Sequence, residues 1–300
     1  MVTPRQYATA GALRAALEAR LLERSLRDDV DLQRLRRQVA FDRLLARMFD
    51  PAHAARDGWV LKGGYALELR FQQARTTKDL DLTVRVVAAG LGVELTTVAS
   101  LRERLQIAAQ VRLPDFFTFV VGDAMLTLDQ APEGGARFPV DAQIDGRTFV
   151  KFHVDLGAGD EVLDPLDQVV GKDWLGFAGI TPVAVPALSA EQHWAEKLHA
   201  YTRPREGRTN TRVKDLVDLV LLIDRYTLDR DRLLFAVQAT FDRRRTHDIP
   251  HELPAPPAEW EKSFAALARE CELAYTPHTA HAHVSKFWQG LKPGSHIDRP

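Results

Sequence analysis

Apolar residues recur at three- and four-residue intervals through the first fifty positions of the chain. Three such series are Leu13, Leu17 and Leu21; Leu32, Leu35 and Val39; and Leu44, Leu45 and Met48. Side chains with this spacing fall on one face of an α-helix, which can then pack against a core. We therefore expect two or three helices between Thr9 and Phe49.

Short strands and helices are expected to alternate after this helical region. The expected elements are a strand at Trp59–Leu61, a helix at Tyr65–Phe71, a strand at Asp79–Val87 and a helix over residues 97–111. Four β-rich runs follow between residues 115 and 157, separated by the Gly, Pro and Asp residues that are typical of turns. The stretch QAPEGGARFP, residues 130–139, is interpreted as an exposed hairpin connection.

Helical spacing returns beyond about residue 185. Ser189 and Gln192 form a capping-box pattern for a helix that ends near Tyr201, and a second helix is expected from Thr211 to about Tyr226. A proline-rich segment then precedes a final helical segment. The pattern predicts an α/β domain with N-terminal helices over residues 1–185 and a mainly α-helical domain over residues 186–300.

Composition narrows the class of protein. Hydrophobic residues make up 45% of the chain and charged residues 27%, which is typical of a soluble globular protein. The N-terminal segment interrupts every apolar run with Arg or Glu, which disfavours a signal peptide or a membrane span. The single cysteine, Cys271, excludes an internal disulfide framework and fits a reducing compartment. We expect a cytoplasmic protein with no membrane partner.

The net charge of −1 gives no overall attraction to nucleic acid, so any acidic partner must meet a local basic patch. Arginines do cluster locally, at residues 34–37, 203–212 and 243–245. The loop over residues 201–212 lies between two expected helices, and it is interpreted equally well as a solvated loop or as a phosphate-binding loop.

Asp79 and Asp81 are the first residues that indicate chemistry. Because side chains alternate along a strand, both carboxylates point to one face while the intervening Leu80 points to the other. Two carboxylates on one face can hold a divalent cation, and oxygen-only ligation favours Mg²⁺. Taken alone, the same pair is also typical of the exposed face of an edge strand.

A glycine pair stands one short helix before these aspartates. Gly63 and Gly64 separate a strand from a helix, where a missing Cβ lets a ligand approach the backbone and the helix start offers N–H groups to phosphate. Lys62 and Arg75 flank the region with positive charge. A triphosphate at the helix start could share metal ions with the two aspartates.

Two-metal phosphoryl transfer calls for a third carboxylate. Asp155 shares the polar face of an expected strand with His153, and Asp141 on the preceding strand is the rival. The choice between the two stays open at this point, as does a purely structural role for Asp155 at the end of a strand.

The helix expected after Thr211 is almost wholly apolar and so is expected to be buried, yet it carries charged residues that need partners. These residues are Lys214, Asp215 and Asp218. Lys214 and Asp218 have the four-residue spacing of a direct pair. Asp215 can pair with Arg212 or with Lys197 from the preceding helix. The alternatives stay open.

Four stretches together carry a family resemblance: LKGGYALELR, RTTKDLDL, EQHWAEKLHAY and RVKDLVDL, spread over about residues 59–222. They resemble the AbiEii/AbiGii-type toxin family, which includes the MenT group of type IV toxins, within the nucleotidyltransferase superfamily of DNA polymerase β-like fold. The resemblance implies an α/β fold: a nucleotidyltransferase-type mixed β-sheet flanked by helices, followed by a mainly α-helical C-terminal domain, in a bilobed enzyme.

The resemblance also implies roles for residues. Gly63 and Gly64 match the phosphate turn, although this chain lacks the serine that usually follows the first glycine, so that hydroxyl contact is absent. The implied catalytic residues are Asp79, Asp81, Lys197 and Asp215; the implied metal ligands are Asp79, Asp81 and Asp155; the implied nucleotide-binding residues are Lys62, Gly63, Gly64, Arg75, Thr77 and Lys214. Thr76 and Thr77 occupy a stretch in which the family often carries Ser.

The activity implied is Mg²⁺-dependent transfer of NMP from an NTP to RNA, most plausibly the 3′ end of tRNA, with release of pyrophosphate. A separately encoded winged-helix antitoxin is the implied partner. Two alternatives are carried alongside: transfer of a nucleotide to a protein hydroxyl, and a non-catalytic module that binds a nucleotide or a partner. The intact Asp79-x-Asp81 pair argues against the non-catalytic alternative.

Overall fold

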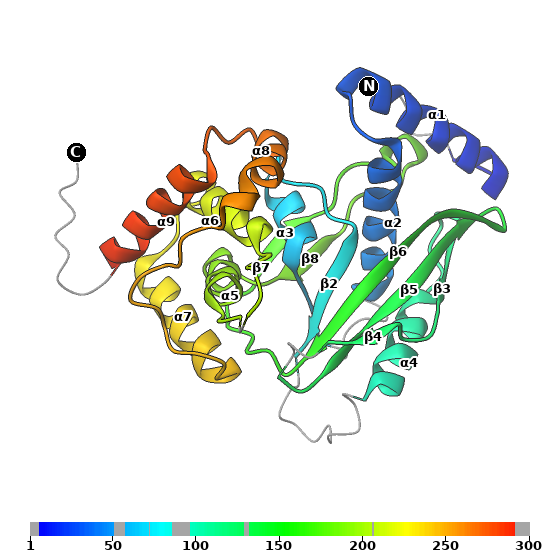
Figure 1. Cartoon of the computed structure of the whole chain (residues 1–300). Coiled ribbons are helices and arrows are strands. Elements are labelled where there is room, and N and C mark those ends of the chain that lie inside the picture. The colour runs from blue at the N-terminus through cyan, green and yellow to red at the C-terminus, as the bar shows by residue number, and fades with distance from the viewer. Residues whose placement is uncertain are drawn as a thin grey trace. The chain divides into compact units, whose positions relative to one another are not determined.

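The computed structural model describes residues 6–50, 58–71, 73–85, 97–128, 132–205 and 207–291. The chain forms two compact units (Figure 1). The first contains residues 1–69, 77–160 and 168–187, and the second contains residues 70–76, 161–167 and 188–300. The second unit therefore includes two short segments that stand, in sequence, among the elements of the first.

A mixed sheet forms the framework of the first unit. Its eight strands among the described residues are β1 (Trp59–Lys62), β2 (Asp79–Val84), β3 (Phe117–Val121), β4 (Leu126–Thr127), β5 (Gly135–Ile144), β6 (Arg147–Ala158), β7 (Asp167–Val170) and β8 (Ala184–Ala187). The strand order is β3-β5-β6-β2-β1-β8-β7, with β4 paired to β5. β2 thus lies between β1, to which it is antiparallel, and β6, to which it is parallel.

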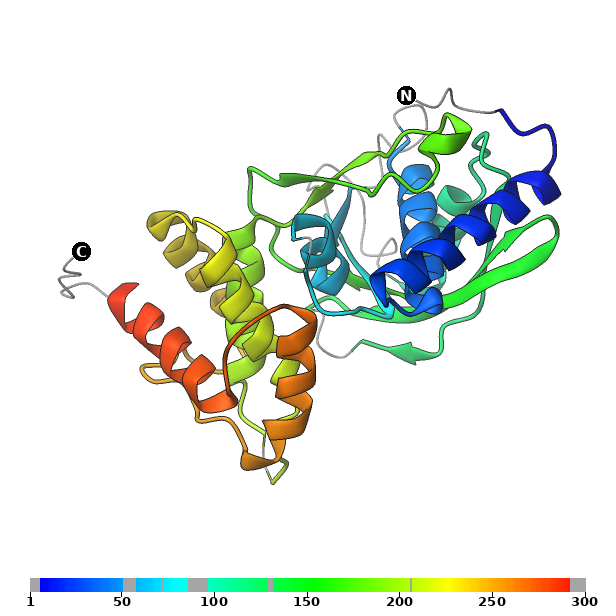
Figure 2. The same cartoon turned by 90° about the horizontal axis from the view of Figure 1, so that it is seen from above.

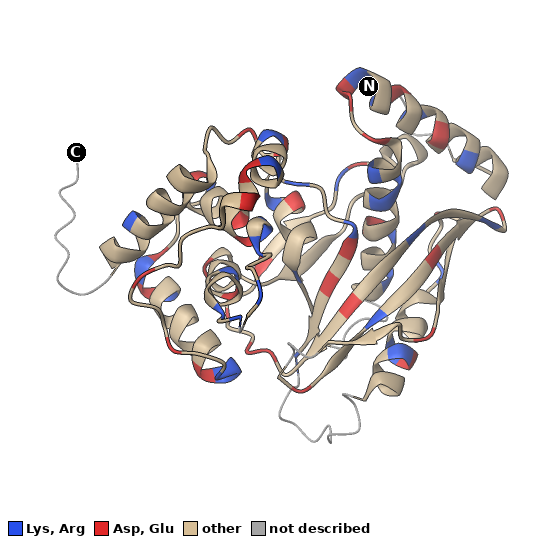
Figure 3. Ribbon diagram, in the orientation of Figure 1, with Lys and Arg blue, Asp and Glu red and all other residues tan. Residues whose placement is uncertain are grey.

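Helices cover one face of this sheet. They are α1 (Ala10–Asp28), α2 (Leu32–Met48) and α4 (Val98–Ala109). Phe41 of α2 packs edge-on against Phe152 of β6, with 4.9 Å between the ring centroids. Buried and half-exposed residues alternate along β5 and β6, so the opposite face of the same strands carries the polar side chains. Figure 3 shows acidic positions gathered on the neighbouring strands β2 and β6.

The N-terminal helices, the first two strands and the four β-rich runs confirm the predicted pattern, while two details differ and one cannot be compared. β7 and β8, with four residues each, were not predicted. β5 begins at Gly135, so half of the expected hairpin connection over residues 130–139 is strand. The expected last residues of the strand that begins at Asp79 lie outside the described residues.

The second unit is helical from residue 190 onward. Its helices are α5 (Ala190–Thr202), α6 (Val213–Arg225), α7 (Arg230–Arg244), α8 (Glu261–Glu270) and α9 (Pro277–Leu291). Elsewhere among the described residues, α3 (Gly63–Arg70) follows β1, and short 3₁₀ turns lie at Gly176–Ala178 and Ala258–Trp260. Ser189 caps α5 by accepting a hydrogen bond from the Gln192 amide, as its spacing predicted.

α6 lies at the centre of the second unit. Every residue from Asp215 to Leu222 is buried, because α5 covers one side of the helix while α8 and α9 cover others (Figure 2). Charged side chains on this helix therefore have to be paired within the protein. No helix among the described residues has the length and apolar character needed to cross a membrane.

Candidate active site

The turn from β1 into α3 brings the glycine pair against the paired aspartates. Gly63 has a φ of +67°, and a Cβ built on it would lie 2.0 Å from Oδ2 of Asp81. Glycine is needed here for two reasons, since the backbone is left-handed and the carboxylate fills the space of a side chain. The two halves of the predicted motif are in contact, and Gly64 is buried directly behind them.

Asp79 and Asp81 share one face of β2, as strand alternation predicted, and the intervening Leu80 is fully buried. Asp79 remains 30% exposed, with one oxygen 3.2 Å from Nδ1 of His153 and the other 3.2 Å from Nη2 of Arg137. Two partly exposed carboxylates therefore stand beside the glycine turn.

Asp155 lies opposite Asp81 in the parallel register of β2 and β6, which places it beside the pair. Both of its oxygens accept hydrogen bonds of 2.7 Å from Arg137, one from Nε and one from Nη2. The bond to Asp155 raises the pKa of Arg137 above its usual range against a smaller opposing effect of burial. The rival Asp141 lies farther along β5 and accepts hydrogen bonds from Gln143 and Thr148.

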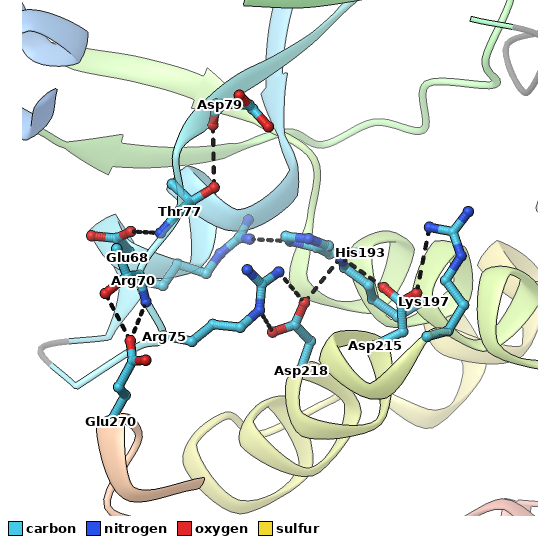
Figure 4. Close-up of polar contacts among 12 residues, drawn as sticks. Glu68, Arg70, Arg75, Thr77, Asp79, His193, Lys197, Asp215, Asp218 and Glu270 are labelled. Atoms are coloured by element: carbon cyan, nitrogen blue, oxygen red, sulfur yellow. Dashed lines mark hydrogen bonds and ion pairs between the residues drawn. The ribbon is translucent and has the colours of Figure 1, made fainter. Parts of the chain in front are cut away.

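Lys62 and Thr77 are both engaged within the first unit. The Lys62 ammonium pairs with the buried carboxylate of Asp160. Thr77 donates its backbone N–H to Glu68 at 2.7 Å and its hydroxyl to the backbone oxygen of Asp79 at 3.2 Å (Figure 4). Thr77 therefore fixes the entry of the chain into β2.

Lys197 of α5 is held between two carboxylates of α6 in the second unit. Its Nζ lies 3.1 Å from Oδ1 of Asp215 and 3.0 Å from Oδ2 of Asp218 (Figure 4). Burial alone would lower the pKa of Lys197, but the charges of Asp218 and Asp215 outweigh it and raise the pKa above its usual range. The pair with Asp215 was one of the sequence alternatives, and Arg212 lies 3.8 Å from the same carboxylate.

Arg75 was expected to flank the phosphate turn, whereas the structure buries its side chain in an ion pair within the second unit. Its Nε and Nη2 each donate a 2.7 Å hydrogen bond to Asp218, and the two side chains are 6% and 0% exposed. The suggested pair of Lys214 with Asp218 does not form, because Asp218 is turned toward Arg75 and Lys197 and Lys214 is exposed.

His193 adds a buried neutral group to this unit. Its Nδ1 lies 3.2 Å from Nη1 of Arg70, and Nη2 of the same arginine donates to Asp167 at 2.8 Å. Burial and the nearby cations Lys197 and Arg70 lower the pKa of His193 well below its usual value. Sequence reasoning missed this histidine, and it missed Arg137, because their partners are distant along the chain.

Two aspartates, Asp79 and Asp81, offer the oxygen donors that Mg²⁺ prefers. Asp81 lies against a glycine with no side chain to block a ligand. Among the described residues, no group of three or more His, Cys, Asp or Glu side chains is arranged to hold a metal ion. The pair nevertheless fits such an ion in its donor chemistry.

The glycine turn that opens a helix and the carboxylates on the next strand offer phosphate-binding amides and cation-binding oxygens, the groups that nucleotidyl transfer requires. Comparison with known proteins narrows the class. The chain belongs to the nucleotidyltransferase AbiEii toxin family of type IV toxin–antitoxin systems, whose family model matches residues 43–289. It is thus a nucleotidyltransferase toxin.

Comparison with solved structures reports on the fold. MenT4, a nucleotidyltransferase toxin from Mycobacterium tuberculosis, is 18% identical, with a TM-score of 0.60 over 94% of this chain and 90% of its own. JHP933 from Helicobacter pylori is 14% identical, with a TM-score of 0.44 over 87% of this chain and 92% of its own. A comparison with curated proteins finds no match.

Proposed function

We propose that this toxin uses Mg²⁺ to transfer NMP from an NTP to the 3′ end of tRNA and thereby blocks translation. The observation that carries the proposal is the contact between the glycine turn and the metal-binding pair, where Asp81 occupies the Cβ position of Gly63. A triphosphate bound at the N–H groups of this turn would lie directly beside the carboxylates.

Asp79 and Asp81 would hold the Mg²⁺ ion, which when bound supplies positive charge to the triphosphate. Backbone N–H groups at Gly63 and Gly64 would bind phosphate oxygens. An acceptor hydroxyl oxygen bonds to the α-phosphorus, the bond to the pyrophosphate oxygen breaks, and the hydroxyl proton passes to solvent. Thr77 supports the reaction indirectly, because its hydroxyl fixes the backbone at Asp79.

Lys197, to which the family resemblance assigns a role in nucleotide binding, would act as a permanent cation. Asp215 and Asp218 hold its ammonium group from one side, so its position does not depend on the flexibility of a long side chain. Asp215 would orient Lys197, and the exposed Lys214 beside it would meet a phosphate of the substrate.

The choice of RNA as acceptor is supported by a cluster of basic residues. Arg203, Arg205, Arg208 and Arg212 follow one another closely between α5 and α6, and Arg208 is exposed. Such a loop can bind phosphates of an RNA backbone without reading its sequence. We further propose a cytoplasmic location and a winged-helix antitoxin as the inhibitory partner, in accordance with the type IV family.

The experiment is transfer of label from each α-³²P-labelled NTP, with Mg²⁺, to purified tRNA and to cell extract. Label in untreated tRNA supports the proposal if no label enters tRNA whose 3′-terminal diol was oxidised with periodate before the incubation. The Asp79→Asn and Asp81→Asn variants should lose transfer, whereas Asp145→Asn, in the exposed β5–β6 turn, should retain it. Label in protein would instead identify a protein hydroxyl as acceptor, and no label with either acceptor would refute the transferase assignment to these substrates.

A further inference from the structure

Arg137 and Asp155 form a two-bond ion pair on the polar face of the sheet. The two residues lie directly opposite each other on the antiparallel strands β5 and β6, so the pair needs no displacement of either backbone. Both carboxylate oxygens accept from the guanidinium at 2.7 Å in a two-bond arrangement. Asp155 has only 14% of its side chain exposed.

This geometry conflicts with the role of third metal ligand that the sequence suggested for Asp155. A metal ion on Asp155 would have to displace Arg137 from one or both oxygens. Asp79, by contrast, accepts a single bond of 3.2 Å from Arg137. The structure therefore separates a pair of aspartates that suits a cation from a third aspartate that holds an arginine.

The charges of the group support this division. The group contains three carboxylates and one guanidinium: Asp79, Asp81, Asp155 and Arg137. Its net charge is therefore −2, which one divalent cation would neutralise. Arg137 carries a permanent positive charge, because a guanidinium is not deprotonated in proteins. The guanidinium thus acts as a built-in cation beside the carboxylates.

Arg137 also has donor capacity that no described residue uses. Its three hydrogen bonds among the described residues come from Nε and Nη2, and none comes from Nη1. The side chain is 29% exposed, so Nη1 can meet a ligand. A guanidinium held in place by a carboxylate, with an unused N–H pair, is well suited to a phosphate oxygen.

We infer that Asp155 is a positioning residue, not a metal ligand, and that it holds Arg137 so that Nη1 binds a phosphate of the substrate beside Asp79. The inference rests on the proposed nucleotidyl transfer. The phosphate can belong to the NTP or to the acceptor RNA, and the two sources are distinguished by which affinity falls.

The first test needs no turnover. Mn²⁺ binding is titrated by electron paramagnetic resonance for the wild-type chain and for Asp155→Asn, Asp79→Asn and Asp145→Asn. We expect Asp155→Asn and Asp145→Asn to bind Mn²⁺ within about twofold of wild type, and Asp79→Asn to lose about tenfold or more. A loss of tenfold or more in Asp155→Asn would overturn the inference, because it would make Asp155 a ligand.

The second test measures binding of an α,β-methylene NTP analogue and of tRNA, again without turnover. Arg137→Ala and Asp155→Asn should weaken one of these ligands about tenfold to a hundredfold, as expected for a lost charge-assisted hydrogen bond. Weaker binding of the analogue places the phosphate on the nucleotide, and weaker binding of tRNA places it on the acceptor. Unchanged binding of both ligands would contradict the inference.

Two further variants test whether Asp155 acts on ligand binding through Arg137 or independently of it. The double variant Arg137→Ala, Asp155→Asn should bind no more weakly than Arg137→Ala alone, because Asp155 acts through Arg137. Arg137→Lys keeps the charge but loses the two-bond geometry, so it should recover only part of the affinity. Additive losses in the double variant would contradict the positioning role. If wild type binds both ligands but transfers no label, the proposed reaction fails while these binding results still decide the roles of Arg137 and Asp155.

Discussion

Arg75 donates two 2.7 Å hydrogen bonds to Asp218, and the two side chains are almost completely buried. Burial by itself would raise the pKa of Asp218, but the charges of Arg75 and Lys197 outweigh it and lower the pKa well below its usual value. Asp218 therefore stays ionised in the folded chain and stabilises the second unit.

Replacement of Asp218 by Ala should destabilise the protein by about 3–5 kcal/mol, because it leaves buried cations without their shared carboxylate. Urea unfolding monitored by circular dichroism would measure the change in free energy. Asp231→Ala, in an exposed surface pair, is the matched control and should change stability by less than about 0.5 kcal/mol. The double variant Arg75→Met, Asp218→Leu should recover part of the loss. Equal stability of Asp218→Ala and wild type would disprove the structural role.

Gly63 and Gly146 provide a matched pair for testing the glycine turn. Both have a positive φ, +67° and +64°, but only Gly63 has Asp81 in the Cβ position, whereas nothing lies within 4 Å of the Cβ position at Gly146. Each Ala substitution should cost about 1–2 kcal/mol of backbone strain. Gly63→Ala should additionally displace Asp81 and reduce NMP transfer by at least about a hundredfold, an effect of about 3 kcal/mol on the barrier.

Gly146→Ala should leave the transfer rate within about twofold of wild type. Stability from chemical unfolding and initial rates of transfer are measured on the same preparations. Equal loss of activity in both variants would show that strain alone, and not the displacement of Asp81, accounts for the effect.

Asp42 should make the stability of the first unit depend on pH. The carboxylate is buried and accepts hydrogen bonds from the Tyr65 hydroxyl and the Lys172 amide, and burial raises its pKa from 3.8 to about 6. Between these values the folded chain binds more protons than the unfolded chain, so the contribution of Asp42 to stability falls as pH rises from about 4 to about 6.

Asp42→Asn should remove this dependence, because an amide does not titrate. Relative to wild type, the variant should gain up to about 3 kcal/mol in unfolding free energy between pH 4 and pH 7, at about 1.4 kcal/mol for each pKa unit. Thermal and urea unfolding at several pH values would measure the difference. Parallel pH profiles for the two proteins would contradict the assignment to Asp42.

Lys197 should remain protonated across the physiological range. Its pKa is raised by Asp218 and Asp215 against the effect of burial, so its stabilising contribution is fully present below its unfolded pKa of about 10.5 and is lost only at higher pH. Carbon-13 NMR of the lysine ε-carbon, with Lys197→Arg to assign the signal, should show no titration of Lys197 below pH 10. A midpoint near pH 8 would instead indicate a lysine that acts as a proton donor or acceptor.

Local patterns were sufficient for part of the site. The alternation along Asp79-Leu80-Asp81 and the glycine pair one helix earlier were correctly placed, because each depends on a few consecutive residues. The contact between Lys197 and Asp215 could also be anticipated, since their helices are consecutive in the chain and one is almost wholly buried.

The pair of Arg137 with Asp155 could not be predicted in this way. A regular hairpin closed by the Asp145-Gly146 turn would place Arg137 opposite Val154, on the other face of the sheet. An irregularity beside Ala142 shifts the register by one residue and brings Asp155 opposite Arg137. Two consecutive buried residues, Phe149 and Val150, mark the bulge in the burial pattern of β6.

The division of the chain into units has a consequence for genetic dissection. The polypeptide passes from one unit to the other five times, at residues 69/70, 76/77, 160/161, 167/168 and 187/188. A fragment ending at residue 187 would retain Arg75 while deleting Asp218, and a fragment starting at residue 188 would do the reverse. Neither fragment should fold on its own. Truncations near this boundary should therefore yield aggregated or degraded protein, and not a folded enzyme with part of the activity.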